Sequence, residues 1–320
     1  MKRMIRVWTL SLLALLAVTG NEIVPSTPLL QEPQASPAVL KVCWGCTYGS
    51  IQGALDAARP GDIIEVEAIP LPLLSLPYYW EKALVISKPI TIRATKRFAD
   101  LPDPALAGEY ANITAESGQV LIEGFVFLNT GLWWYSKADL ILRRNRFIDT
   151  NPYTTAEVRL GGKGQAQLID NEIIDSFVYV FEAAQILLTF NRFIRSDINV
   201  HSSIQVTLEH NFIEGAGVSI GGPGDYYLDG NIFIGGLSLA AKESSIGLEI
   251  QGSEVQTNPT IVTANRNIIA RYGKGIAIGG ILCEVGQGEW LQLSGQENVI
   301  EQNGQDLCPP DYPWPPGFRK

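Results

Sequence analysis

The sequence predicts an all-β solenoid, in which short parallel strands stack in successive coils. The first observation is a sequence motif that recurs, with variations, three times between Leu168 and Ile213: LIDNEII, LLTFNRFI and TLEHNFI. The Asn of each copy lies twenty residues from the next, with Leu three positions before it and Ile or Phe two positions after it. Periods of this size are typical of solenoids, whose repeats bury their apolar faces only against their neighbours. We therefore expect one domain for the folded body.

The second observation is that the same Asn signal extends over most of the chain. Seven Asn residues have Phe or Ile at the second following position, with spacings of 26, 20, 20, 20, 36 and 31 residues: Asn145, Asn171, Asn191, Asn211, Asn231, Asn267 and Asn298. The longer intervals indicate coils that carry inserted loops. We expect these Asn residues to be structural, because Asn tolerates left-handed backbone angles at a corner and stacked amides can bond from coil to coil.

The third observation separates strands from helices. Apolar residues alternate with period two and are mostly β-branched, which favours strands. The pairs are Val158/Leu160, Val178/Val180, Ile198/Val200, Val218/Ile220, Ile186/Leu188 and Val206/Leu208.

The start of the fold has a recognisable pattern. Ser50 can cap a helix whose apolar stripe is Ile51, Ala54, Leu55 and Ala58, and strands follow at 63–66, 83–86 and 90–92. Residues 50–62, together with 88–92, resemble the opening of secreted right-handed parallel β-helix proteins of the pectin-lyase-like superfamily. The resemblance implies a single-stranded right-handed parallel β-helix, with the helix capping its N-terminal end.

The ends of the chain have a different composition. Residues 1–20 are predicted to be a signal peptide, since Lys2, Arg3 and Arg6 precede a short apolar run, although an uncleaved anchor is the alternative. Residues 21–42 are predicted to be a disordered linker, 43–308 the β-helix and 309–320 a Pro-rich tail that covers the last coil. We expect a secreted, periplasmic or cell-surface protein, monomeric and without stable membrane insertion after cleavage.

The four Cys residues are predicted to form disulfides, as is usual for exported chains. Three pairings are formally available, and closeness in sequence favours Cys43–Cys46 and Cys283–Cys308. A redox-active Cys43–Cys46 pair is the alternative, although no thioredoxin-like pattern surrounds it. The distance between the two pairs in sequence, with two His in the chain, argues against a metal site. We expect no metal and no cofactor.

The charge of the chain restricts its partners. The formal net charge is −9, with 24 basic and 33 acidic residues, and it becomes −12 without Lys2, Arg3 and Arg6. Nucleic acid is therefore not an expected partner.

Residues between the buried ones should line up on one outward strand face. This face is predicted to bind a ligand, because aromatic rings can stack on a sugar and Arg can pair with a uronate carboxylate. An ordinary strand surface, where aromatic residues are also common, is the alternative. The residues of the predicted binding face are Trp133, Tyr135, Arg159, Tyr179, Phe181, Asn199 and His201.

The sequence contains few signals of a catalytic site. The Asp cluster of the superfamily's calcium-dependent lyases and the Gly-His-Gly and Arg-x-Lys motifs of its hydrolases are absent. Asp197 and His201, with Arg159, are the candidate catalytic residues; the pairs Asp170/Asp175 and Asp225/Asp229 are further carboxylate groupings. We expect a non-catalytic exported protein that binds polysaccharide or acts at the cell envelope. The alternative is a diverged lyase or hydrolase acting on uronate-containing polysaccharide.

Overall fold

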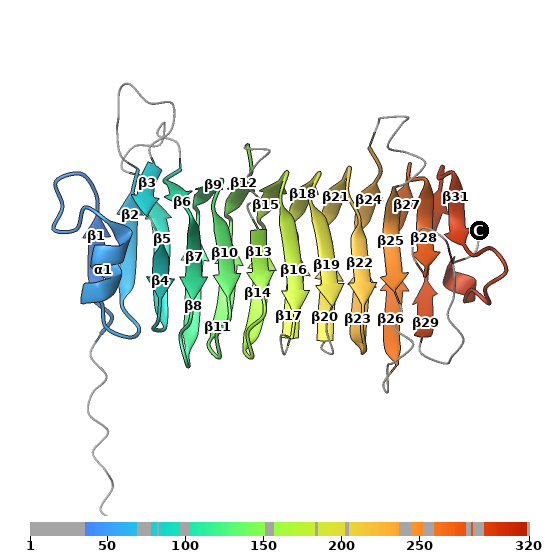
Figure 1. Ribbon diagram of the computed structural model, residues 1–320, viewed down its shortest axis with the longest axis horizontal. Coiled ribbons are helices and arrows are strands. Elements are labelled where there is room, and N and C mark those ends of the chain that lie inside the picture. The colour runs from blue at the N-terminus through green and yellow to red at the C-terminus, as the bar shows by residue number, and fades with distance from the viewer. Residues whose placement is uncertain are drawn as a thin grey trace, which may run out of the picture. The chain divides into compact units, whose positions relative to one another are not determined.

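Each coil of the chain contributes one strand to each of three parallel sheets (Figure 1). The computed structural model describes residues 36–68, 78–81, 83–96, 103–150, 157–182, 185–201, 205–236, 245–251, 259–279, 283 and 291–318. Residues 37–320 form one compact unit. The predicted signal peptide and the predicted linker up to residue 35 lie outside the described residues.

Sheet A has eleven strands, and sheets B and C have ten each. Sheet A consists of β1 (Val39–Val42), β2 (Ile63–Glu67), β5 (Ile90–Thr95), β8 (Gln119–Glu123), β11 (Asp139–Arg143), β14 (Gln165–Ile169), β17 (Gln185–Thr189), β20 (Gln205–Glu209), β23 (Gly224–Asp229), β26 (Thr260–Asn265) and β29 (Leu291–Gln296). Sheet B consists of β3 (Tyr78–Glu81), β6 (Ala105–Gly108), β9 (Val126–Leu128), β12 (Arg146–Ile148), β15 (Glu172–Ile174), β18 (Arg192–Ile194), β21 (Phe212–Glu214), β24 (Ile232–Ile234), β27 (Ile268–Ala270) and β30 (Val299–Glu301). Sheet C consists of β4 (Leu84–Ile86), β7 (Tyr110–Ile113), β10 (Gly131–Trp134), β13 (Glu157–Leu160), β16 (Phe177–Phe181), β19 (Asp197–His201), β22 (Val218–Gly221), β25 (Ile246–Gln251), β28 (Lys274–Ile278) and β31 (Gln305–Cys308).

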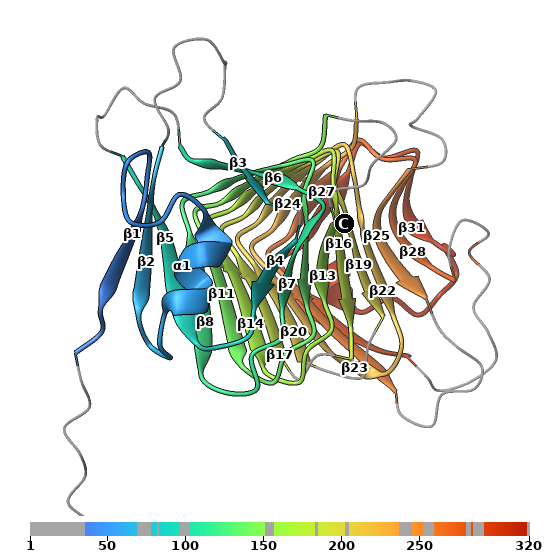
Figure 2. The same cartoon turned by 60° about the vertical axis from the view of Figure 1, so that its left-hand side comes forward.

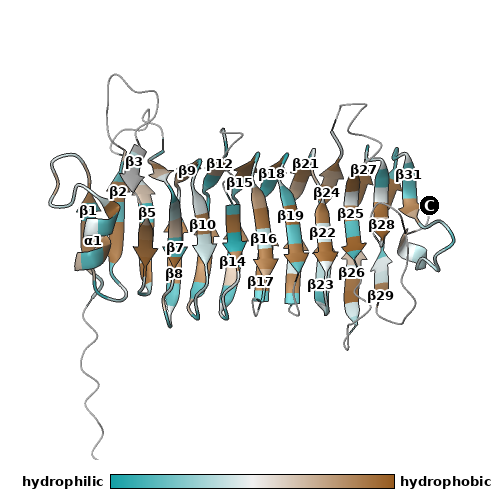
Figure 3. Cartoon of the chain, in the orientation of Figure 1, coloured by the Kyte–Doolittle hydropathy of each residue, from teal (hydrophilic) through white to brown (hydrophobic). Residues whose placement is uncertain are grey.

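The core lies inside the coils, where the alternating apolar residues meet. The predicted pairs are buried as expected: Val178 and Val180 in sheet C, and Ile186 and Leu188 in sheet A, are at most 1% exposed. Figure 3 shows the matching alternation of hydrophobic and hydrophilic residues along the strands. Burying one such side chain contributes about 1.5–3 kcal/mol. The predicted fold, a right-handed parallel β-helix with an N-terminal helix, is confirmed.

The seven repeated Asn residues form an interior ladder along the turn between sheets A and B. We call these residues the Asn ladder: Asn145, Asn171, Asn191, Asn211, Asn231, Asn267 and Asn298. The Nδ2 of Asn171, for example, donates to Oδ1 of Asn191 at 3.0 Å and to the carbonyl of Leu142 at 2.9 Å. The expected bonding of amides from coil to coil is thus confirmed.

The expected backbone role of these Asn residues is wrong. The left-handed angles fall on the residue that precedes each Asn, such as Phe190 with φ 55° and His210 with φ 53°. The Asn residues themselves turn inward, and Asn191 is 1% exposed. Their repetition along the chain therefore reflects buried hydrogen bonding rather than tolerance of left-handed geometry.

Helix α1 (Ile51–Ala57) covers the N-terminal end of the coil stack (Figure 2). The Ser50 side chain caps it by accepting from the Gly53 amide at 3.1 Å. At its other end, the Lys88 ammonium donates to the carbonyls of Leu55 and Ala58 at 2.9 and 2.7 Å, which satisfies acceptors that the helix leaves open. No helix among the described residues is long and apolar enough to cross a membrane.

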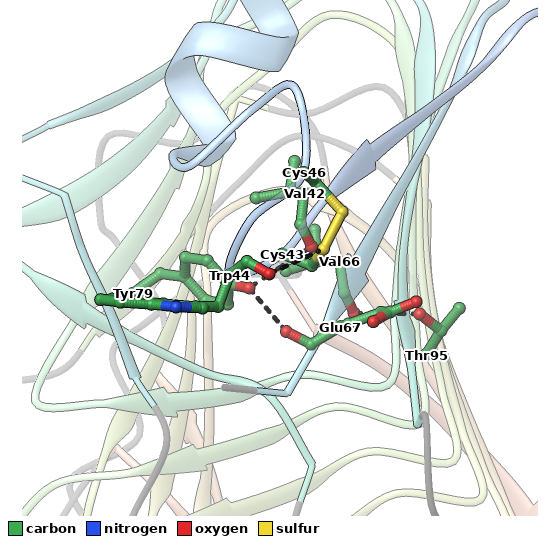
Figure 4. Close-up of a disulfide and its surroundings, with 8 residues drawn as sticks. All are labelled: Val42, Cys43, Trp44, Cys46, Val66, Glu67, Tyr79 and Thr95. Atoms are coloured by element: carbon green, nitrogen blue, oxygen red, sulfur yellow. Dashed lines mark hydrogen bonds between the residues drawn. A yellow bond between two sulfur atoms is a disulfide. The ribbon is translucent and has the colours of Figure 1, made fainter. Parts of the chain in front are cut away.

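The Cys43–Cys46 disulfide closes the loop between β1 and α1 (Figure 4). Nearby, the Tyr79 hydroxyl donates to the carbonyl of Glu67 at 2.6 Å. The predicted linker is wrong at its C-terminal end, because Val39–Val42 form β1 and pair with β2. The two Cys residues do not lie at the terminus of a helix, because α1 begins at Ile51, beyond Cys46. The loop therefore lacks the helix-terminal position that lowers the pKa of a redox-active Cys.

The Pro-rich tail covers the other end of the stack, as expected. Its Trp314 and Phe318 side chains are 3% and 2% exposed, and Pro316–Phe318 form a 3₁₀ helix, η2. The Cys283–Cys308 disulfide connects β31 to the segment that follows β28. Both predicted disulfides are thus confirmed.

Candidate binding face

The predicted binding residues occupy adjacent outward positions on sheet C. They alternate with buried residues such as Val178 and Val180, so the strand geometry turns them to the surface. The register of sheet C aligns one residue from each coil in what we call the central column: Trp133, Arg159, Tyr179, Asn199, Ser219 and Glu249. Phe181 and His201 also pair in register, at the next outward position of β16 and β19.

Aromatic rings form a platform over the first part of this column. The rings of Tyr110 and Trp133 stack with centroids 4.6 Å apart and planes within 5°. Farther along, the centroids of Phe177 and Tyr179 are 5.9 Å apart, with an interplanar angle of 20°. The sequence pattern pointed to Trp133 and Tyr179 but missed Tyr110 and Phe177. Phe177 lies two positions before Tyr179 on the same strand, and Tyr110 lies on the strand next to that of Trp133.

A second aromatic pair borders the platform. Tyr135, 44% exposed, lies with its ring centroid 5.6 Å from that of Phe181. Both rings lie against Gly161, where an added Cβ would come within 2.5 Å of the Phe181 ring. The missing side chain at Gly161 therefore makes room for this pair.

Arg159 is the cation of the platform, and its charge is already paired. Its Nε donates to the Glu157 carboxylate, which raises the pKa of Arg159. The guanidinium carbon lies 5.4 Å from the centroid of the Trp133 ring, a cation–π distance. Arg159 thus holds the platform together and has part of its hydrogen-bonding capacity already occupied.

Next to the platform, sheet C is hollowed into a groove of about 320 Å³. We call this the polar groove. Its polar lining residues are Asp197, Asn199, Ser219, Ser245 and Glu249, and residues 215–218 and Ile246 complete the lining. Asp197 accepts a hydrogen bond from the Gly217 amide at 3.1 Å. Beneath it, burial and the negative charge of Asp197 raise the pKa of Tyr272, whose hydroxyl donates to the Ala216 carbonyl at 2.6 Å.

The three catalytic candidates do not converge in the structure. Asp197 and His201 stand at opposite ends of β19, about 13 Å apart by the rise of a strand. Arg159 lies on β13, two strands away from β19 in sheet C. Of the three candidates, Asp197 lines the polar groove. Their catalytic role stays a prediction.

In the other carboxylate groupings, Asp175 and Asp229 have structural partners. Asp170 and Asp175 adopt left-handed angles of 55° and 53°, and Asp175 pairs with Arg195. Asp229 is 5% exposed and pairs with Arg266, which lowers the pKa of Asp229. Asp225 is exposed at the start of β23. Asp175 and Asp229 thus form ion pairs between neighbouring coils.

His210 is a corner residue, with a left-handed φ of 53°. Its ring stacks on that of Phe190, with centroids 5.2 Å apart, at the turn that precedes the Asn ladder. Within the described part of the chain, no three His, Cys, Asp or Glu residues are grouped in a way that could hold a metal ion.

The fold defines the class of this protein as a right-handed parallel β-helix. Among solved structures, the chain is similar to pectin methylesterase from Aspergillus niger in its deglycosylated form, with a TM-score of 0.42 and 13% identity over 83% of this chain and 86% of that chain. No family model and no curated protein matches the sequence. This likeness concerns the fold and assigns no activity.

Proposed function

We propose that this chain is an exported, non-catalytic β-helix protein that binds polysaccharide along sheet C or acts through such binding at the cell envelope. The observation that carries the proposal is the alignment of Trp133, Arg159 and Tyr179 in one column, flanked by Tyr110 and Phe177.

The chemistry of a sugar chain fits this face. The faces of sugar rings are apolar C–H surfaces that stack on aromatic rings, while their hydroxyls need hydrogen-bonding groups. Neighbouring strands lie about 4.8 Å apart, so the column offers a contact at each coil along an extended chain. A rigid sheet presents these contacts without paying an ordering entropy on binding.

Two disulfides support the exported location, because disulfides persist in oxidising compartments. The predicted signal peptide agrees with the same location.

The test is a screen of the purified protein against neutral and uronate polysaccharides by affinity electrophoresis, followed by calorimetry on the best ligand. We expect Tyr179→Ala to weaken binding at least tenfold, since a stacking ring is removed. Tyr227→Ala removes a ring from the outward face of sheet A and is the matched control. Retention of no polysaccharide, or equal effects of the two variants, would contradict the proposal.

A diverged lyase or hydrolase acting on uronate-containing polysaccharide is the second candidate. The observation in its favour is that Asp197 and Glu249, two carboxylates, line one groove. The same screen, scored for new chain ends and for unsaturated products that absorb in the ultraviolet, tests it. Turnover that is lost in Asp197→Asn would establish it in place of the binding function.

A further inference from the structure

The polar groove continues the aromatic platform along the same sheet. Asn199 belongs to both, because it pairs in register with Tyr179 on one side and with Ser219 on the other. Ser219 in turn pairs with Glu249. A sugar chain that follows the central column from the platform therefore reaches the groove within one coil.

The groove has a hydroxyl group whose hydrogen bonding no described residue satisfies. The Ser219 hydroxyl oxygen is buried and has no hydrogen-bond partner among the described residues. A buried polar atom without a partner costs about 1–3 kcal/mol, so its presence calls for an explanation. Because Ser219 stands between Asn199 and Glu249 in register, a ligand seated in the groove would meet all three side chains.

The charge of the groove is negative. Among the described lining residues, the ionisable side chains are Asp197 and Glu249, and neither is in an ion pair with a described residue. The cation nearest along the column, Arg159, is paired with Glu157. Lys274 lies one coil farther on, in register with Ile246, and already takes part in an interaction of its own.

We propose that the polar groove is a sugar subsite that selects an uncharged, hydroxyl-bearing residue and rejects a uronate. This proposal rests on the polysaccharide-binding function proposed above. Carboxylates at neutral pH accept hydrogen bonds but donate none, so they suit sugar hydroxyls and repel a second carboxylate. Hydrogen bonds to an ionised acceptor are also about twice as strong as those between neutral groups.

The test compares two ligands that differ in charge on one backbone: an oligogalacturonate and its fully methyl-esterified form. Binding of each to the full protein is measured by calorimetry at low salt. We expect the uncharged ester to bind at least tenfold tighter. We also expect Glu249→Gln to reduce this ratio at least threefold by improving binding of the charged form, since it removes one repelling carboxylate.

The control is Glu209→Gln, which makes the same change of charge on sheet A and should leave the ratio unchanged. Thermal unfolding of each variant confirms that it is folded. Equal or tighter binding of the charged form by the unmodified protein, or a ratio that Glu249→Gln leaves unaltered, would overturn the subsite while leaving polysaccharide binding intact. Failure of both forms and of every neutral polysaccharide to bind would overturn the binding function and the subsite together.

Discussion

At the residue scale, each interior member of the Asn ladder connects three coils. Asn191 accepts from the amide and Nδ2 of Asn171 at 2.9 and 3.0 Å, and its own Nδ2 donates to Leu168 and Asn211 at 2.7 and 3.1 Å. All of these groups are shielded from water, so a missing partner is not replaced by solvent.

We therefore expect Asn191→Ala to lower the free energy of unfolding by about 3 kcal/mol, since it leaves buried donors and acceptors unpaired. Chemical denaturation measures the change. Gln185→Ala, on the outward face of the same coil, is the control and should change stability by less than about 0.5 kcal/mol. Similar values for the two variants would mean that the ladder contributes little.

At the element scale, the Pro-rich tail completes the Asn ladder where the coils end. Inside the stack, Asn267 donates its amide and Nδ2 to Oδ1 of Asn298, both at 3.0 Å. Asn298 is the last residue of the Asn ladder, and its amide and Nδ2 donate to the carbonyl of Gly317, at 3.4 and 3.1 Å. The tail thus supplies the acceptor that a further coil would provide.

Gly317→Ala should detach this acceptor, because a Cβ there would overlap the Gly295 carbonyl and the backbone of Gln296. We expect faster hydrogen exchange of the β29 and β31 amides, with unchanged exchange in β17 and β20. Gly49→Ala is the control, since a Cβ at Gly49 meets open space. Unchanged exchange at the C-terminal end in Gly317→Ala would argue against the capping role.

The register of some strands could be predicted from the sequence, and that of others could not. Coils of twenty residues could be aligned by counting, so the outward neighbours Tyr179 and Asn199 were predictable. Glu249 was not, because thirty residues separate it from its register partner Ser219 and the inserted loop hides the alignment. β1 was missed for another reason, since its sequence VLKV lies in a segment rich in polar residues and Pro and becomes a strand only by pairing with β2.

At the scale of the whole molecule, one continuous core runs through the stack, so a group that stabilises one end contributes to the stability of the whole fold. Asp62 accepts from the amides of Arg59 and Ala38, both at 2.8 Å, and these hydrogen bonds lower the pKa of Asp62 below its ordinary 3.8. Asp62 thereby fixes the start of β1 to the loop that follows α1. Its carboxylate is a link between solution pH and the N-terminal end of the stack.

The sign of the pH effect follows from the lowered pKa. The stabilisation is complete above pH 3.8 and is lost as the pH falls from there through the pKa of the folded state, because the unfolded chain binds the proton more tightly. Asp62→Asn loses one of the two accepted bonds, so we expect it to be less stable at pH 7 by about 2 kcal/mol. The difference between the two proteins should shrink as the pH approaches about 2, as measured by denaturation at a series of pH values. The control is Asp225→Asn, which changes an exposed carboxylate on sheet A; its free energy of unfolding should follow the same pH dependence as that of the unmodified protein. If Asp62→Asn differed from the unmodified protein by the same free energy at every pH, the Asp62 charge would not be the linked group.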